Sequence, residues 1–174
     1  MNLAADTGSR KARAWQVLAG VPDPEIPAVS VCELGIVREV QESEDGALQV
    51  VLTPTYSGCP ATEMIERDVR EALLRAGLGP VRTHMRRAPA WSTDWISEDG
   101  RRKLRDYGIA PPAACSGAPA GSGEVFVLRR DEAPACPRCA SRHTAQIAGF
   151  GSTPCKALWR CLDCAEPFDY FKPF

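Results

Sequence analysis

The sequence predicts an α+β fold in two modules, a small sheet with helices packed on one face and a smaller module held by four cysteines. Three observations carry this prediction. Residues 10–110 show the order helix–strand–strand–helix–strand in their apolar periodicity. Residues 111–123, PPAACSGAPAGSG, carry no charge and little to bury, which predicts a flexible linker. Residues 124–174 contain two CxxC pairs.

The first elements follow from turn residues and alternation. Residues 10–20 are compatible with a helix that Gly20 ends, and the three prolines of VPDPEIPAVSV (21–31) predict a rigid loop. GIVREVQE (35–42) and GALQVVLTPT (46–55) predict two strands of a hairpin, joined by a turn at SEDG.

From Pro60 the apolar period changes to that of a helix, which Gly77 ends. The apolar face of this helix comprises Ala61, Ile65, Val69, Ala72, Leu73 and Ala76. PVRTHMRRAP (80–89) alternates as a third strand, polar on one side. A last helix is predicted with Ser97 as its cap and Gly108 at its end.

Composition excludes several classes of protein. The chain has 174 residues, 44% of them hydrophobic, with a net charge of −1, so no bulk positive field attracts nucleic acid or anionic membrane. No apolar run approaches the roughly 18 residues of a membrane span, and the first 15 residues lack the apolar core of a secretion signal. We therefore expect a cytoplasmic protein, in which cysteines are metal ligands or nucleophiles rather than disulfides.

Cys59 lies between Gly58 and Pro60, directly before the predicted second helix. If Pro60 takes the first helical position, Cys59 becomes the N-cap residue, and the helix dipole lowers the pKa of its thiol from about 8.5. A small residue that merely fits a tight turn is the alternative. Asp23 and Glu25 occupy the proline-rich loop, where a fixed carboxylate near the thiol and a turn-forming role are both open.

The segments DPEIPAVSVCELGIVREV (23–40) and LTPTYSGCPATEMI (52–65) resemble the MIP18 family, formerly DUF59, and the resemblance spans most of residues 12–88. Members of that family act in iron–sulfur cluster assembly or delivery. The resemblance implies a functional thiol at Cys59, a transient iron or cluster ligand, with a polar surround of Asp23, Glu25 and Thr53.

Cysteine number limits what this first module can hold. Its only other cysteine is Cys32, so Cys59 cannot be part of a four-cysteine cluster within one chain. A homodimer that pairs two copies of Cys59, or a transient ligand role, fits the count. A thiol enzyme with His84 as the base is the rival hypothesis.

Four cysteines of the second module have the spacing of metal ligands. CPRC and CLDC, separated by 21 residues, place four thiolates on two tight turns, and this predicts a structural zinc ribbon with three strands. Spacing alone leaves an iron–sulfur cluster open. With seven Lys/Arg against six Asp/Glu, residues 124–174 favour a protein-docking module over nucleic-acid binding. The ligand set is Cys136, Cys139, Cys161 and Cys164.

The MIP18-like module is followed by APAWSTDWISEDGRRKLRDYGIAPP (88–112) and then by CPRC and FGSTPCKALWRCLDCAEPFDYFKPF (150–174). With these segments the chain resembles, over nearly its whole length, the PaaD (PaaJ) family of the phenylacetyl-CoA 1,2-epoxidase system of phenylacetate catabolism. The resemblance implies a non-catalytic accessory protein that matures or repairs the iron or iron–sulfur centres of the oxygenase or reductase subunits. The sequence has no Glu-x-x-His pairs, no GxGxxG and no P-loop, which agrees with an accessory role. A purely structural interaction subunit is the other alternative. The roles of four residues stay open: Cys32, Cys115, Cys155 and His143.

Overall fold

The computed structural model describes residues 7–56, 58–112 and 133–173. The chain forms two compact units, one that ends at Lys103 and one that runs from Leu104 to Pro173. Cys115 and most of the predicted linker 111–123 lie outside the described residues, so the predicted domain boundaries stay a prediction. None of the described helices has the length and hydrophobicity needed to cross a membrane.

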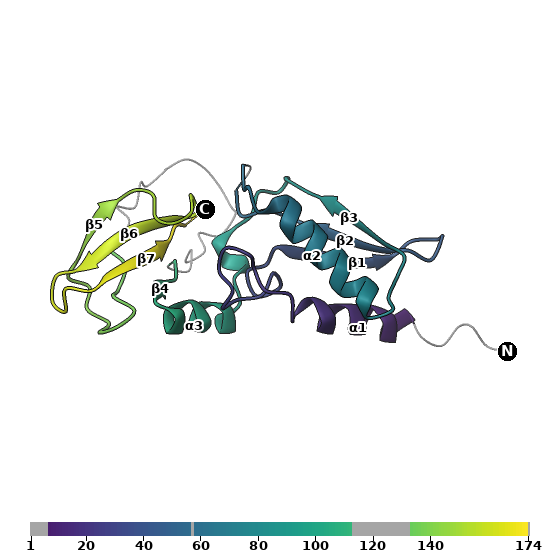
Figure 1. Ribbon diagram of the computed structural model, residues 1–174, viewed down its shortest axis with the longest axis horizontal. Coiled ribbons are helices and arrows are strands. Elements are labelled where there is room, and N and C mark those ends of the chain that lie inside the picture. Colours follow the sequence, from purple (N-terminus) through teal and green to yellow (C-terminus); the bar gives the residue numbers. More distant parts are fainter. Residues whose placement is uncertain (1–6, 57, 113–132, 174) are drawn as a thin grey trace, which may run out of the picture. The chain divides into compact units, whose positions relative to one another are not determined.

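The sheet of the first unit has three strands in the order β1-β2-β3 (Figure 1). β1 (Val37–Glu42) and β2 (Leu48–Leu52) pair antiparallel, which confirms the predicted hairpin. β3 (Val81–Met85) pairs with β2 in the parallel sense. Two parallel neighbouring strands must be joined by a crossover connection, and the helical segment between β2 and β3 is that connection.

Two helices cover one face of this sheet. α1 (Thr7–Leu18) contacts β1 and α2 (Thr62–Arg75) contacts β3, while the two helices also contact each other (Figure 1). The buried stripe of α2 consists of Ile65, Val69 and Leu73, members of the predicted apolar face. The α+β fold with helices on one face is thus confirmed.

After β3 the chain continues through a 3₁₀ turn, η1 (Thr93–Trp95), into α3 (Glu98–Tyr107). Ser97 caps α3 as predicted, because its Oγ accepts a hydrogen bond from the N–H of Gly100 at 3.0 Å. The helix ends before Gly108, which has φ +95°.

The second unit contains a four-stranded sheet in the order β4-β7-β6-β5. The predicted strands are β5 (Thr144–Ala148), β6 (Lys156–Cys161) and β7 (Pro167–Phe171), which pair antiparallel in succession (Figure 1). β4 (Ile109–Ala110) adds a short parallel edge beside β7 that the sequence did not indicate.

The core of the second unit is small and includes two of the predicted metal ligands. Its buried cluster consists of Ala110, Cys136, Cys161, Phe168 and Tyr170. Trp159 packs against this cluster, edge to face with Tyr170 at a centroid distance of 6.0 Å. Two of the four predicted ligands are therefore part of the core packing of this unit.

Candidate functional site

The turn around Cys59 differs from the prediction. α2 begins at Thr62, and its N-cap residue is Ala61, whose side chain makes no capping bond. The N–H of Cys59 donates to the carbonyl of Tyr56 at 3.3 Å, and the Thr62 hydroxyl donates to the carbonyl of Cys59 at 2.8 Å. The prediction that Pro60 starts the helix and Cys59 caps it was wrong, because these two turns displace the helix start by two residues.

Burial raises the pKa of the Cys59 thiol above its ordinary value, opposite to the predicted direction. The backbone N–H of Ala61 bonds to the sulfur and lowers its pKa, as does the Tyr56 hydroxyl. The carboxylates of Glu25 and Asp23 add to the rise. Since the net shift is upward, the neutral thiol is favoured when no cation is present.

The loop that carries Asp23 and Glu25 is held in a turn by the carboxylate of Asp23. Asp23 is 5% exposed, and its Oδ1 accepts hydrogen bonds from the N–H of Glu25 at 2.9 Å and of Ile26 at 2.8 Å. This is the turn-forming role that the sequence left open. The loop also brings both negative charges close enough to act on Cys59. Their role as a polar surround for a cargo stays a prediction.

Thr53 completes the predicted surround, although no hydrogen bond joins it to Cys59 among the described residues. Thr53 follows β2 and is 1% exposed, and its N–H donates to the carbonyl of Ile36 at 2.8 Å. Tyr56, which the sequence interpretation missed, lies close enough for its hydroxyl to lower the pKa of Cys59. Its position three residues before Cys59, in a segment with turn signals, was the available sign.

Other candidate residues lie apart from Cys59. His84 is exposed on β3, and no hydrogen bond or ion pair joins it to Cys59 in the part of the chain that the structure describes. Cys32 is half-buried, and burial together with the charge of Glu33 raises its pKa to about 12. Cys59 and the two loop carboxylates also form no preassembled three-ligand group among the described residues.

Four cysteine sulfurs converge in the second unit. The Sγ atoms of Cys136, Cys139, Cys161 and Cys164 all lie within 4.8 Å of one another. Two of the sulfur pairs are separated by 3.7 Å, from Cys136 to Cys164, and by 3.5 Å, from Cys139 to Cys161. A tetrahedral zinc ion with Zn–S bonds of about 2.3 Å requires sulfur–sulfur distances of about 3.8 Å. The four residues therefore fit this ion.

The charge state of these sulfurs also favours a bound cation. The N–H of Cys164 donates to the sulfur of Cys161 at 3.5 Å, and such backbone bonds lower the pKa of Cys161 to about 6. The N–H of Ser141 lowers the pKa of Cys139, but the neighbouring sulfurs outweigh it and raise that pKa to about 12. Cys161 is thus readily ionised, whereas Cys139 and Cys164, whose pKa values are raised, hold protons that a metal ion would displace.

Hydrogen bonds join the two CxxC turns directly. Asp163, in the second turn, accepts from the hydroxyl of Ser141 and lies 2.9 Å from Nδ1 of His143. His143 thus lies outside the sulfur cluster. Cys155 also lies outside it, buried at 2% exposure with its sulfur 3.0 Å from the Thr153 hydroxyl.

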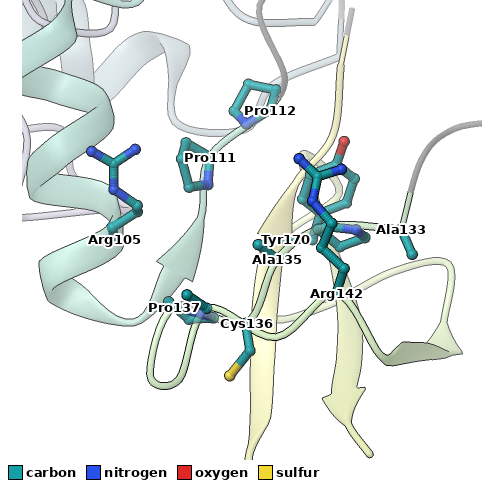
Figure 2. A pocket seen from close by; sticks show the side chains of 11 residues that line it. Arg105, Pro111, Pro112, Ala133, Ala135, Cys136, Pro137, Arg142 and Tyr170 are labelled. Carbon is teal, nitrogen blue, oxygen red and sulfur yellow. The ribbon is translucent and has the colours of Figure 1, made fainter.

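A cavity of about 330 Å³ lies beside the first CxxC turn (Figure 2). Four prolines and Tyr170 contribute to its walls, and Arg105 and Arg142 also line it. Figure 2 shows the Cys136 sulfur pointing away from this cavity. The cavity is therefore no entry path to the four sulfurs.

Comparison with known proteins assigns the chain to a family. It is 49% identical over 158 residues to an Escherichia coli (strain K12) protein named as a component of a 1,2-phenylacetyl-CoA epoxidase, covering 91% of this chain and 90% of that relative. This chain belongs to the PaaD family. Residues 120–172 match the PaaD zinc beta ribbon domain, which contains all four converging cysteines.

The first unit of this PaaD-family chain has relatives of its own. Residues 11–83 match the family described as iron–sulfur cluster assembly protein. A Porphyromonas gingivalis protein named as an Fe-S protein maturation auxiliary factor is 36% identical over 90 residues, covering 51% of this chain and 85% of that relative. The crystal structure of a DUF59 domain from Bacillus anthracis superposes with a TM-score of 0.52 at 25% identity, covering 56% of this chain and 92% of that one.

Proposed function

We propose that this protein is a non-catalytic maturation factor for a phenylacetyl-CoA epoxidase system. It acts in the cytoplasm and inserts or repairs iron or iron–sulfur centres in the oxygenase or reductase subunits, with Cys59 as the transient ligand of the cargo. Membership in the PaaD family and the likeness of the first unit to an Fe-S maturation factor support this role.

The observation that carries the proposal is that the charges of two carboxylates, Glu25 and Asp23, act on the half-buried Cys59 sulfur. Burial, and after it the charges of Glu25 and Asp23, disfavour a thiolate, which makes Cys59 a poor nucleophile at neutral pH. The same negative charges attract an iron cation, and a bound cation in turn favours the thiolate. The electrostatics of the site thus suit a metal cargo better than an attack on an electrophile.

A single protein thiolate suits a metal cargo that must later be released. Stable iron–sulfur clusters are held by four cysteine or histidine ligands, whereas no second cysteine joins Cys59 in a metal-ligand group within the described ranges. A single thiolate with carboxylate neighbours gives a site from which iron can be passed to a protein with a complete ligand set. Two copies of Cys59 in a homodimer would serve the same purpose.

The ribbon has a different task in this proposal. Its four cysteines hold a structural zinc ion, which supplies folding free energy that the small core lacks. The balance of seven basic against six acidic residues in 124–174 argues for docking to a protein rather than to nucleic acid. We infer that the ribbon docks on the oxygenase or reductase subunits.

Co-production of the protein with the epoxidase subunits tests the role of Cys59. Cys59→Ser should abolish support of epoxidase activity and lower the iron content of the purified oxygenase or reductase, while the thermal unfolding midpoint of the variant stays near that of the wild type. Cys32→Ser is the matched control, because it changes a half-buried cysteine of the same unit outside the site.

The alternatives predict other results. Full iron content and activity with Cys59→Ser would refute metal handling at this residue. If the protein were a purely structural subunit, a stable stoichiometric complex would support activity regardless of Cys59. If it were a thiol enzyme, activity would be lost while the iron content of the partner subunits stayed unchanged.

A further inference from the structure

The hydroxyl of Thr53 is a buried polar group that lacks a hydrogen-bond partner within the described residues. The residue is 1% exposed, and its backbone N–H is already used in the bond to Ile36. Leaving such a group unpaired destabilises the folded state, because its lost hydrogen bonds to water are not replaced. A valine would fill the same volume without this cost, so the hydroxyl indicates a ligand that binds it.

Thr53 lines a cavity of about 290 Å³ in the first unit. Ligand pockets range upward from about 300 Å³, so this one suits a small metabolite rather than a nucleotide. It is formed where the segment after β2 meets the segment after β3. The lining residues are Thr53, Pro54, Thr55, Tyr56, Arg87, Ala90 and Trp91.

The lining combines one cation with an apolar wall. Arg87 is exposed and has no ion-pair partner among the described residues, whereas its neighbour Arg86 is paired with Glu39 at 2.8 Å. Trp91 is 4% exposed, and its indole N–H is bound to the carbonyl of Leu34 at 2.9 Å, so its ring is held in place. Pro54 and Ala90 extend the apolar wall, and no carboxylate lines the cavity in the part of the chain that is described.

We propose that this cavity binds a small organic carboxylate. A guanidinium group only donates hydrogen bonds, and the Thr53 hydroxyl donates or accepts, so the complementary group is an oxyanion. The apolar wall at Trp91 takes an apolar body, which inorganic phosphate lacks. The cavity adjoins the proposed iron site, because its lining includes Tyr56, which acts on Cys59, and Thr53 of the predicted surround, but carboxylate binding does not depend on iron handling.

Isothermal titration with phenylacetate tests the proposal, because this probe joins one carboxylate to a flat apolar ring. Two comparison ligands each lack one feature of phenylacetate. Phenylacetamide has the same shape without the charge, and inorganic phosphate is an anion without the apolar body. Phenylacetate should bind the full-length protein at least about tenfold more tightly than either, since hydrogen bonds to charged groups are the stronger kind.

Three variants locate the binding. Arg87→Gln should weaken phenylacetate binding about tenfold or more, and Thr53→Val about fivefold, in line with a charged and a neutral hydrogen bond. Arg86→Gln is the matched control, since Arg86 is adjacent and of equal charge but does not line the cavity. It should change binding by no more than about twofold, the range of a general charge effect.

Several results would overturn the proposal. The proposal fails if phenylacetate does not bind at millimolar concentration, or if phenylacetamide or phosphate binds as tightly as phenylacetate. It also fails if Arg86→Gln and Arg87→Gln weaken phenylacetate binding equally. Thermal unfolding gives an independent check on the hydroxyl. Thr53→Val should unfold at the wild-type temperature or above, and a clear drop would show that the hydroxyl stabilises the fold itself.

Discussion

Replacing Cys164 with serine would remove one of four sulfur donors without disturbing the core, because Cys164 is exposed while Cys136 and Cys161 are buried. Structural zinc contributes about 10–16 kcal/mol to the folding of small domains. Whole domains have net stabilities of only about 5–15 kcal/mol. If the four cysteines hold zinc as we propose, the second unit should therefore unfold when the ion is lost, since two of the five residues in its buried cluster are predicted ligands.

Metal analysis and NMR measure this outcome. The wild-type protein should contain about one zinc ion per chain, as a four-cysteine structural site requires. In Cys164→Ser, zinc should fall well below this value, and the dispersed amide signals of β6 and β7 should collapse together with the indole signal of Trp159. Signals of the first unit should persist, because its core is separate.

Cys155→Ala is the matched control for this prediction. Cys155 is buried in the same unit but lies outside the sulfur cluster. Its loss should cost about 1–2 kcal/mol of packing, an ordinary effect of a single substitution, and leave the zinc content unchanged. A folded second unit in metal-free Cys164→Ser would refute the reasoning, and iron with acid-labile sulfide at this site would refute the assignment of zinc.

Two further predictions concern the first unit. Gly35 has φ +69°, and a Cβ added there would lie 2.6 Å from both the Cβ and the carbonyl oxygen of Trp95. Gly35→Ala should therefore lower the free energy of unfolding, measured by urea titration, by about 2–4 kcal/mol. Gly46→Ala should cost only about 1 kcal/mol, because Gly46 has φ +79° but nothing within 4 Å, and equal losses would contradict the clash. Alkylation of Cys59, followed by peptide mass spectrometry, should rise with pH through a midpoint above the free-thiol value of about 8.5, because the pKa of Cys59 is raised. His84→Ala should leave this profile unchanged, and a shift would favour a thiol enzyme.

Periodicity and spacing predicted much of this fold. The buried stripe of α2 could be predicted because apolar residues recur at helical intervals. The CxxC pairs could be predicted because the two cysteines of each pair lie on one local turn. Ser97 was predicted correctly as a cap for the same reason, since its hydrogen bond to Gly100 spans three residues. Each of these features is decided within a short stretch of sequence.

The features that were missed depend on contacts between distant segments. Cys59 was expected to have a lowered pKa from its helix, but burial and charges some 35 residues away in the sequence, at Glu25 and Asp23, decide the direction. The cavity at Thr53 joins residues after β2 to Arg87 and Trp91, and no periodic pattern links these segments. β4 has two residues, too few for any alternation to appear.

The two thiol sites show why one chain carries both a permanent and a transient metal ligand in our proposal. In the ribbon, four sulfurs lie at tetrahedral spacing and two of them, those of Cys136 and Cys161, belong to the small core, so release of the proposed metal costs the folding free energy of the unit. At Cys59 the surrounding fold is complete without a metal, because Cys59 is not among the buried residues that form the core of the first unit. Release from Cys59 then costs only the bonds at the site, and reprotonation of a thiol whose pKa is raised favours that release. A cargo ligand needs this second arrangement, since iron must leave without unfolding the protein that delivers it.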